Sequence, residues 1–168
     1  MRAGANRLAL QVFKWRSGSW IEDQDFYRFS GLFRSVHLRR LPAVHLADLR
    51  VGVTVAQDLS GAVVRLRTRL EGEGFVRAVL AGVGELTDGG DGAASIAVTD
   101  PRLWSVEDPH LYDLSIEVLD AAGRLVEVVP QRVGLRRFGI EGGVLRINGE
   151  RLVFKGVNRH EFGARGGS

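Results

Sequence analysis

The sequence predicts a mainly β protein built around an immunoglobulin-like sandwich. Apolar and polar residues alternate with a period of two along most of the chain, which is typical of half-buried strands. The 22 glycines among 168 residues punctuate this pattern as turns, and no segment has the spacing of an amphipathic helix. Between His45 and about Arg136 the alternation predicts five to seven short strands in about 90 residues, which fits such a sandwich.

The pattern of residues 6–41 predicts the last strands of an earlier domain. In residues 6–13 Leu8, Leu10 and Val12 alternate with polar or small residues, so we expect a strand with these three side chains inward. A polar, aromatic and acidic loop follows over 14–30, and the strand pattern returns at 31–41. Pro42 interrupts it, which places a domain boundary nearby.

The central segment supplies the strands of the sandwich. They are expected at residues 47–55, 62–72, 75–82, 95–100, 111–120 and 124–136. In 62–72 Arg65, Arg67 and Arg69 alternate with apolar residues, which predicts that the arginines lie on the solvent face. The polar, glycine-rich run 84–95 is expected as a turn. The loop 100–114 is expected to cap the core with Trp104, Leu111 and Tyr112.

After Arg136 the alternating pattern gives way to tight turns and one apolar run. This segment holds a Gly142-Gly143 turn, an Asn148-Gly149 turn of the type that closes a two-residue hairpin, and an apolar run from Leu152 to Phe154. That run predicts a strand buried on both faces, as in parallel sheets and barrel cores. Such cores need far more chain than follows it. We therefore expect a fragment: the end of one domain, a whole sandwich and the start of a third domain.

Composition argues against several functional classes. The net charge is +3, but the arginines alternate along strands without aromatic neighbours, so no nucleic-acid partner is expected. Cysteine is absent, which excludes disulfides and thiolate metal sites from this chain. The start has no signal-peptide pattern, and no apolar run approaches the roughly 18 residues of a membrane span. We expect a cytoplasmic protein without membrane association.

The histidines do not predict a metal centre. The four of them, His37, His45, His110 and His160, lie far apart without ligand spacing. His160 and Glu161 begin like a zinc-protease motif, but Ala164 stands where the second histidine is required. Nucleophilic serine chemistry is not indicated either, because no Gly-x-Ser-x-Gly elbow is present.

The loop 14–30 has two interpretations. Carboxylates in a surface loop are commonly just solvated. Here they stand beside aromatic side chains, and aromatic faces next to carboxylates suit a sugar, which offers C–H faces for stacking and hydroxyls for hydrogen bonds. The residues concerned are Trp15, Trp20, Glu22, Asp23, Asp25, Phe26 and Tyr27.

Three stretches together resemble one enzyme family. Residues 3–38, 100–118 and 133–161, in this order, are similar to the large bacterial β-galactosidases of glycoside hydrolase family 2, and the resemblance runs from Arg2 to Gly163. The related β-glucuronidases and β-mannosidases share the architecture, but the Glu-Asp-Gln-Asp run at 22–25 favours the galactosidases. The resemblance implies the C-terminal part of a jelly-roll sugar-binding domain over 1–43, the immunoglobulin-like sandwich over 44–136, and the start of a (β/α)8 barrel over 137–168.

The resemblance also implies a reaction, the retaining hydrolysis of terminal β-D-galactosyl residues, as in lactose-type substrates. Its nucleophile and its acid/base are two glutamates about 5 Å apart. In the family both lie on later barrel strands, and Glu161 matches neither, so this chain alone is expected to be inactive.

Two substrate-binding residues are implied by matched positions. Asp25 matches the residue that reaches from the jelly roll to hold galactose and, with a later barrel residue, a sodium ion. His160, at the end of the first barrel strand, matches the histidine that donates to galactose hydroxyls and favours the transition state. Asn158 and Arg159 would support His160. The family also implies Mg²⁺, with its ligands downstream of this chain. The sequence 162–168 departs from the family, since it lacks a second histidine and a proline.

The implied partners are a β-galactoside substrate and the missing barrel segment, and full-length relatives are expected to be homo-oligomers. Two alternatives remain. One is a free-standing carbohydrate-binding or structural β-sandwich protein. The other is the small subunit of a split β-galactosidase, which a separately encoded barrel chain complements.

Overall fold

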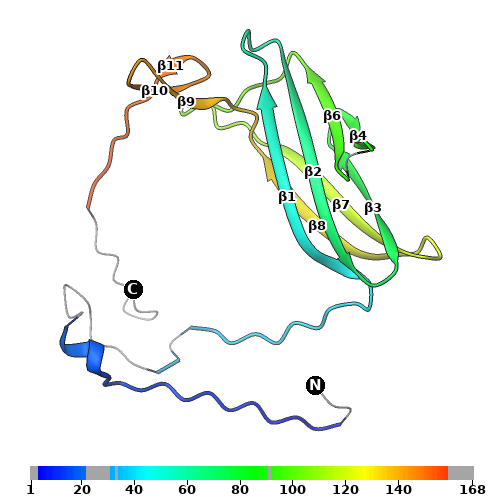
Figure 1. The fold of residues 1–168 in the computed structure, drawn as a ribbon, viewed down its shortest axis with the longest axis vertical. Coiled ribbons are helices and arrows are strands. Elements are labelled where there is room, and N and C mark those ends of the chain that lie inside the picture. The colour runs from blue at the N-terminus through cyan, green and yellow to red at the C-terminus, as the bar shows by residue number, and fades with distance from the viewer. Residues whose placement is uncertain (1–3, 22–30, 33, 91, 159–168) are drawn as a thin grey trace. The chain divides into compact units, whose positions relative to one another are not determined.

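A computed structural model describes residues 4–21, 31, 32, 34–90 and 92–158. The chain divides into two compact units, Arg40–Lys155 and a unit formed by Met1–Arg39 with Gly156–Ser168. Within the described part of the second of these units, the regular element is a short 3-10 helix, η1 (Ser17–Trp20). All of the described strands belong to Arg40–Lys155 (Figure 1).

Two four-stranded antiparallel sheets form the sandwich, as predicted. The first has the order β1-β2-β6-β5 and the second the order β4-β3-β7-β8. This is the immunoglobulin arrangement of constant-type domains with one short strand, β4, added at the edge of the second sheet. The strands are β1 (His45–Val55), β2 (Gly61–Glu71), β3 (Gly74–Leu80), β4 (Gly84–Glu85), β5 (Thr87–Asp88), β6 (Ala94–Thr99), β7 (Tyr112–Asp120) and β8 (Leu125–Val133).

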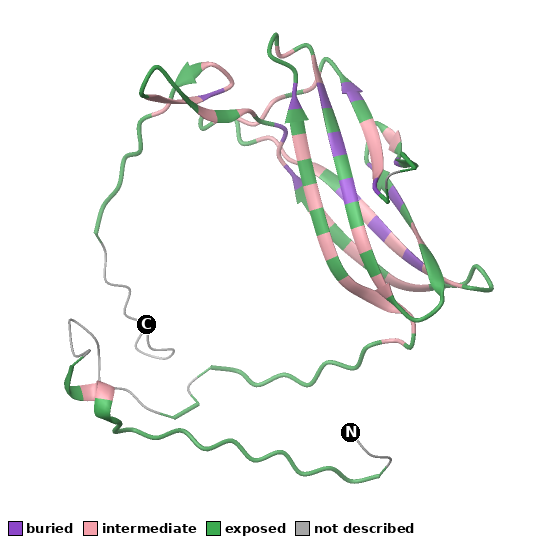
Figure 2. Cartoon of the chain, viewed as in Figure 1, coloured by how far each residue is buried: buried purple, intermediate pink, exposed green. Residues whose placement is uncertain are grey.

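The core lies between these sheets and follows the alternation of the sequence. In β2 Val64 and Leu66 are 0% and 2% exposed, while Arg65, Arg67 and Arg69 face solvent, which confirms the prediction for this strand. Figure 2 shows the alternation as buried and exposed bands along the strands. The second sheet buries its own inward residues against them, namely Ala78, Leu80, Leu114, Ile116 and Val133. All inward core residues are apolar, because a strand with this period presents one apolar face.

The loop between β6 and β7 covers one end of the core. Tyr112 packs against the core cluster, and its hydroxyl accepts a hydrogen bond from the Arg102 amide at 2.9 Å. This resembles the tyrosine corner of immunoglobulin-like domains, where a tyrosine at the start of this strand binds the backbone upstream. Trp104 and Leu111 are half-buried and lie so close to Gly134 that a Cβ there would be 3.1–3.2 Å from their side chains. The three predicted capping residues therefore gather at this end.

A small three-stranded sheet follows the sandwich, with the order β11-β10-β9. Its strands are β9 (Phe138–Glu141), β10 (Val144–Ile147) and β11 (Glu150–Arg151). Glu141 pairs with Val144 and Ile147 with Glu150, so each turn has two residues. Gly142, Gly143, Asn148 and Gly149 all have positive φ, from 50° to 84°, as type I′ turns require. Both predicted turns are confirmed.

Three predicted strands do not form in the structure. The described residues of 6–13 and of 31–41, and also 152–158, have no strand assignment. Leu8, Leu10 and Val12, expected to point inward, are 78%, 57% and 50% exposed, and Val153 and Phe154 are 59% and 70% exposed. The physical reason is that a strand needs neighbours for its backbone and a layer for its apolar face. In the described part of the chain no strand pairs with these segments.

The described residues of the glycine-rich run 84–95 include two short strands that the sequence did not indicate. These are β4 and β5, and between them Leu86 is 6% exposed and donates its amide to the Ala78 carbonyl at 2.8 Å. A single leucine in a polar run gives no periodicity, so the sequence did not reveal this core position.

Candidate functional site

The predicted substrate-binding residues lie mostly outside the described part of the chain. Asp25, Arg159 and His160 fall there, as do Glu22, Asp23, Phe26, Tyr27 and Glu161. Asn158 is the last described residue and is exposed. The structure therefore does not test whether Asp25 and His160 meet at one site, and that prediction stays a prediction.

The aromatic residues before the acidic loop are described, and they form a stacked pair. The rings of Trp15 and Trp20 are 5.8 Å apart at an angle of 15°, and the Lys14 ammonium lies 5.7 Å from the Trp15 ring centroid. The pair is held locally by η1, whose first turn is closed by the Ser19 hydroxyl accepting from the Arg16 amide at 3.1 Å. Trp15 and Trp20 remain 50% and 75% exposed, so aromatic surface is available to an apolar ligand face.

The described histidines have structural surroundings. The ring nitrogen Nδ1 of His45 lies 3.0 Å from the Pro42 carbonyl oxygen, and His110 packs edge-on against Tyr112 at 4.8 Å. His37 is exposed. Among residues 4–21, 31, 32, 34–90 and 92–158, no three His, Cys, Asp or Glu side chains come close enough to hold a metal ion.

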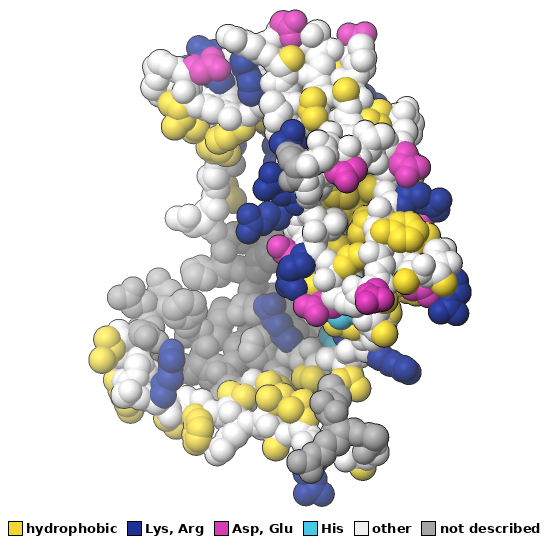
Figure 3. Space-filling model, turned by 45° about the vertical axis from the view of Figure 1, so that its right-hand side comes forward, with side chains coloured by type: hydrophobic (Ala, Val, Ile, Leu, Met, Phe, Trp, Pro, Cys, Tyr) yellow, Lys and Arg dark blue, Asp and Glu magenta, His cyan; other side chains and the backbone are white. Residues whose placement is uncertain are grey.

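The charged side chains of the sandwich form surface pairs and turns rather than an acid/base pair. Arg102 donates two hydrogen bonds to Asp108, at 3.0 and 2.9 Å, and these lower the pKa of Asp108. The pKa of Asp120 is lowered by hydrogen bonds from the backbone and the side chain of Arg124, and that of Asp58 by the Ser60 hydroxyl and amide. A general acid needs the opposite shift, so these three carboxylates are not candidates for that role. Figure 3 shows acidic side chains among the basic ones on the visible face of the sandwich.

An apolar groove of about 670 Å³ lies beside the small sheet. Its lining combines aromatic and aliphatic side chains with three charged ones at Glu107, Arg136 and Lys155. The apolar members are Trp104, Val106, Phe138, Ile147, Leu152, Val153 and Phe154. The Arg136 guanidinium lies over the Trp104 ring at 4.9 Å, which occupies one face of the indole. The groove has the character of a packing surface, since apolar side chains make up most of its lining.

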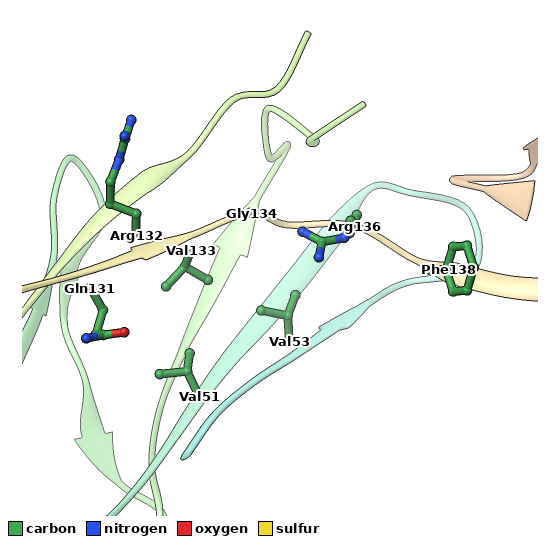
Figure 4. Close-up of a pocket in the computed structure, with 8 residues that line it drawn as sticks. All are labelled: Val51, Val53, Gln131, Arg132, Val133, Gly134, Arg136 and Phe138. Carbon is green, nitrogen blue, oxygen red and sulfur yellow. The ribbon is translucent and has the colours of Figure 1, made fainter. Parts of the chain in front are cut away.

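A second cavity, of about 340 Å³, opens between the edges of β1 and β8 (Figure 4). Val51 and Val53 come from β1 and Val133 from β8, and the Arg132 side chain points away from the space. Gln131, Gly134, Arg136 and Phe138 complete its lining. The lining contains no carboxylate and no histidine, so it offers no group for glycosidic bond cleavage.

Sequence reasoning missed the role of Asn148. The Asn-Gly pair predicted the turn, but Asn148 also binds the sandwich: its side-chain nitrogen donates to the Trp104 carbonyl at 2.9 Å. Its side-chain oxygen accepts from the Arg137 amide, also at 2.9 Å. A contact across 44 residues leaves no local pattern in one sequence, so only the structure reveals it.

The sequence model of "Glycosyl hydrolases family 2" matches residues 44–136, and that of "Glycosyl hydrolases family 2, sugar binding domain" matches residues 1–42. The first match covers the whole sandwich, β1 to β8.

Curated proteins named Beta-galactosidase match nearly the full chain. Those of Halalkalibacterium halodurans and Streptococcus thermophilus are 41% and 43% identical over 98% of this chain. The enzyme of Clostridium acetobutylicum is 39% identical over 99% of it. The chain spans only 17%, 17% and 20% of the length of these three relatives.

Solved structures of β-glucuronidases share the fold. The Lactobacillus rhamnosus enzyme superposes with a TM-score of 0.69 at 30% identity, over 86% of this chain and 24% of that one. Bacteroides uniformis β-glucuronidase 3 gives a TM-score of 0.66 at 29% identity, over 86% of this chain and 19% of that one. Both values are well above those of unrelated folds. The described part of this chain contains no helix long and apolar enough to cross a membrane.

Proposed function

The chain belongs to glycosyl hydrolases family 2, and from this membership we propose that it is part of a retaining β-galactosidase. The observation that carries the proposal is the 39–43% identity to proteins named Beta-galactosidase over nearly all of this chain. The substrate class is terminal β-D-galactosyl residues, as in lactose-type substrates. The similar β-glucuronidase structures have lower sequence identity, 29–30%, which favours galactose over glucuronic acid.

The proposed domain organisation follows the two family matches and the fold. Residues 1–43 form the end of the sugar-binding domain, 44–136 the sandwich, and 137–168 the entry into the barrel. The matches at 1–42 and 44–136 support the first boundary. For the last segment the support is the change from the sandwich to the small sheet β9 to β11.

In the proposed site this chain binds substrate and does not cleave it. Asp25 accepts hydrogen bonds from galactose hydroxyls, and His160 donates to them, most strongly as charge develops on the ring in the transition state. Asn158 and Arg159 hold the imidazole of His160 in position. The nucleophile and the acid/base are glutamates of the barrel beyond this chain, so the chain alone is inactive. The stacked Trp15 and Trp20 precede Asp25 and offer aromatic surface near it in the sequence.

In this proposal the chain supplies only one ligand, Asp25, to the metal ions that the family implies. Asp25 is one carboxylate ligand for sodium, whose remaining ligands come from the barrel, and the Mg²⁺ ligands also lie in the barrel. Among the residues that the structure describes, no cluster fits either ion. The proposed partner is therefore the barrel, either in the same chain or as a complementing subunit. Homo-oligomers of the complete enzyme are part of this proposal.

A second candidate function is a free-standing carbohydrate-binding or structural sandwich. The observation in its favour is that Arg40–Lys155 is a compact unit with its own apolar core. Against it, some outward carboxylates are held in surface pairs such as Arg102–Asp108, and the described residues of this unit show no stacked aromatic pair like that of Trp15 and Trp20.

Titration with galactose tests the proposed function. Trp104→Phe in the full chain leaves Trp15 and Trp20 as the only tryptophans, so their fluorescence reports on the predicted site. We expect a saturable response to galactose and a weaker one to glucuronic acid. The galactose response should be lost in Asp25→Ala and retained in Asp48→Ala, which removes an exposed carboxylate of the sandwich. An equal response in Asp25→Ala and the parent, or a stronger one to glucuronic acid, refutes the proposal.

A further inference from the structure

Asn148 connects the small sheet to the sandwich through both the nitrogen and the oxygen of its side-chain amide. Its side-chain nitrogen donates to the Trp104 carbonyl at 2.9 Å, and its side-chain oxygen accepts from the Arg137 amide at 2.9 Å. Its own backbone amide donates to the Arg137 carbonyl at 2.8 Å. One half-buried residue thus binds both the start of the small sheet and a loop of the sandwich.

Asparagine is specifically suited to this position. Its φ of 50° lies in the left-handed region, which among residues with a side chain asparagine and aspartate tolerate best. The contacts also need an acceptor and a donor on one short side chain, and an amide supplies both. Glycine would keep the backbone conformation but lose both side-chain contacts. Ionised aspartate would keep the acceptor and place a negative oxygen against the Trp104 carbonyl.

Trp104, at the sandwich end of this connection, is fixed on the core by a backbone hydrogen bond. The Trp104 amide donates to the carbonyl of Leu135 at 2.8 Å, and Leu135 is fully buried in the core. The guanidinium of Arg136 covers the Trp104 ring at 4.9 Å. The carbonyl that Asn148 binds therefore belongs to a segment fixed on the core rather than to a free loop.

The other end of this connection lies in the small sheet. Ile147, next to Asn148, is 8% exposed, and Leu152 donates its amide to the Leu145 carbonyl at 2.8 Å, one residue beyond β11. The hairpins of the small sheet are held together by their own pairing, Arg146 with Arg151 and Leu145 with Ile140. The contacts of Asn148 therefore attach a sheet that is itself connected by hydrogen bonds.

We propose that Asn148 is a positioning residue that holds the small sheet β9 to β11 in one orientation on the end of the sandwich. The inference rests on the contacts of Asn148 and is independent of the proposed function. The sandwich would then act as a rigid base for the small sheet.

A distance distribution between spin labels tests this coupling directly. The chain has no cysteine, so Arg67→Cys on the exposed face of β2 and Lys155→Cys after β11 give two unique labelling sites in the full chain. Pulsed electron resonance on this doubly labelled parent is expected to show one narrow distance distribution. Asn148→Gly and Asn148→Asp at pH 7 should broaden it at least two-fold without lowering the thermal midpoint of the sandwich. The control Glu150→Gly introduces a glycine at an exposed residue of the same small sheet and should leave the distribution narrow.

The remaining outcomes overturn the proposal. A broad distribution in the parent means that the small sheet is not fixed, and a narrow one in Asn148→Gly means that Asn148 does not fix it. Broadening that appears only together with a lower thermal midpoint shows a general stabilising role. No sugar takes part in the measurement, so a failed galactose titration would refute the proposed function and leave this result standing.

Discussion

The carboxylate of Glu127 on β8 accepts a hydrogen bond from the backbone amide of Leu46 on β1 at 2.8 Å, and so bridges the two sheets of the sandwich. The contact lies where the β1–β2 register shifts between Leu46 and Asp48. A bulge leaves backbone groups without their ladder partners, and a charged acceptor from the opposite sheet satisfies one of them. The start of β1 is therefore joined to β8 by the Glu127 side chain.

We predict that Glu127→Ala destabilises the sandwich by about 1.5–3 kcal/mol, because the half-buried Leu46 amide loses a charged acceptor. Glu127→Gln keeps an acceptor oxygen and should cost less than about 1 kcal/mol. Urea unfolding followed by circular dichroism measures both. Glu71→Ala removes an exposed ion pair with Arg69 and serves as the control, with an expected cost below about 1 kcal/mol. Equal costs for Glu127→Ala and Glu71→Ala would show that the bridge contributes nothing specific.

Gly74, at the start of β3, is predicted to tolerate no side chain. A Cβ there would overlap the Leu119 carbonyl oxygen and lie 2.8 Å from a Val44 methyl group. Since the first of these neighbours is backbone, the strand pair must move, and we expect Gly74→Ala to cost about 1–3 kcal/mol. Gly139→Ala is the matched control, because nothing lies within 4 Å of its Cβ position. Thermal unfolding of the two variants side by side tests this, and an undiminished midpoint for Gly74→Ala would contradict it.

Acid should weaken the turn between β7 and β8 through Asp120. Hydrogen bonds from the Arg124 backbone and side chain and from the Ala122 amide lower the pKa of Asp120 in the folded protein. A group whose pKa is depressed by folding stabilises the fold above its unfolded pKa, about 3.9, and loses this contribution as the pH falls through the folded value. The Asp120 contribution is thus complete at pH 7 and declines below about pH 4.

Asp120→Asn keeps an acceptor for the two amides but has no proton to gain, so its thermal midpoint should fall less than that of the parent between pH 5 and about pH 2.5. Asp113→Asn removes one negative charge from the same strand, where the carboxylate lies 3.8 Å from Arg132, and controls for net charge. Parallel pH profiles for Asp120→Asn and the parent would exclude the turn as a source of acid sensitivity.

The sandwich could be predicted from the sequence because its strands carry their own signal. The alternation in β2 and the two-residue turns at Gly142 and Asn148 are local patterns with a direct geometric meaning. The segment around Leu8 carries the same alternation and that around Phe154 an unbroken apolar run, but neither forms a strand, since such patterns show only that a segment is able to pair. Whether a segment pairs depends on residues elsewhere in the chain. This explains why the strands predicted in 6–13, in 31–41 and from Leu152 to Phe154 were wrong.

For the candidate site, the sequence predicted which residues take part but not where they lie in space. Asp25 and His160 came from matched motifs, and both lie outside the described residues, so their geometry stays a prediction. The contact between Asn148 and Trp104 spans 44 residues, and the groove beside Trp104 likewise combines residues from separate segments, so nothing local marks them. Long-range side-chain contacts of this kind are the part of a site that sequence patterns do not encode.

The central claim, that this chain contributes substrate-binding residues of a β-galactosidase but not its catalytic glutamates, is tested most directly by a hydrolysis assay. Purified chain is incubated with a nitrophenyl β-D-galactoside, in parallel with His160→Ala prepared in the same way. The account predicts that neither protein releases nitrophenol above the buffer blank, because the proposed function assigns the nucleophile and the acid/base of the covalent route to two glutamates of the barrel. Turnover by the parent that His160→Ala loses would be intrinsic to the chain and would contradict the account.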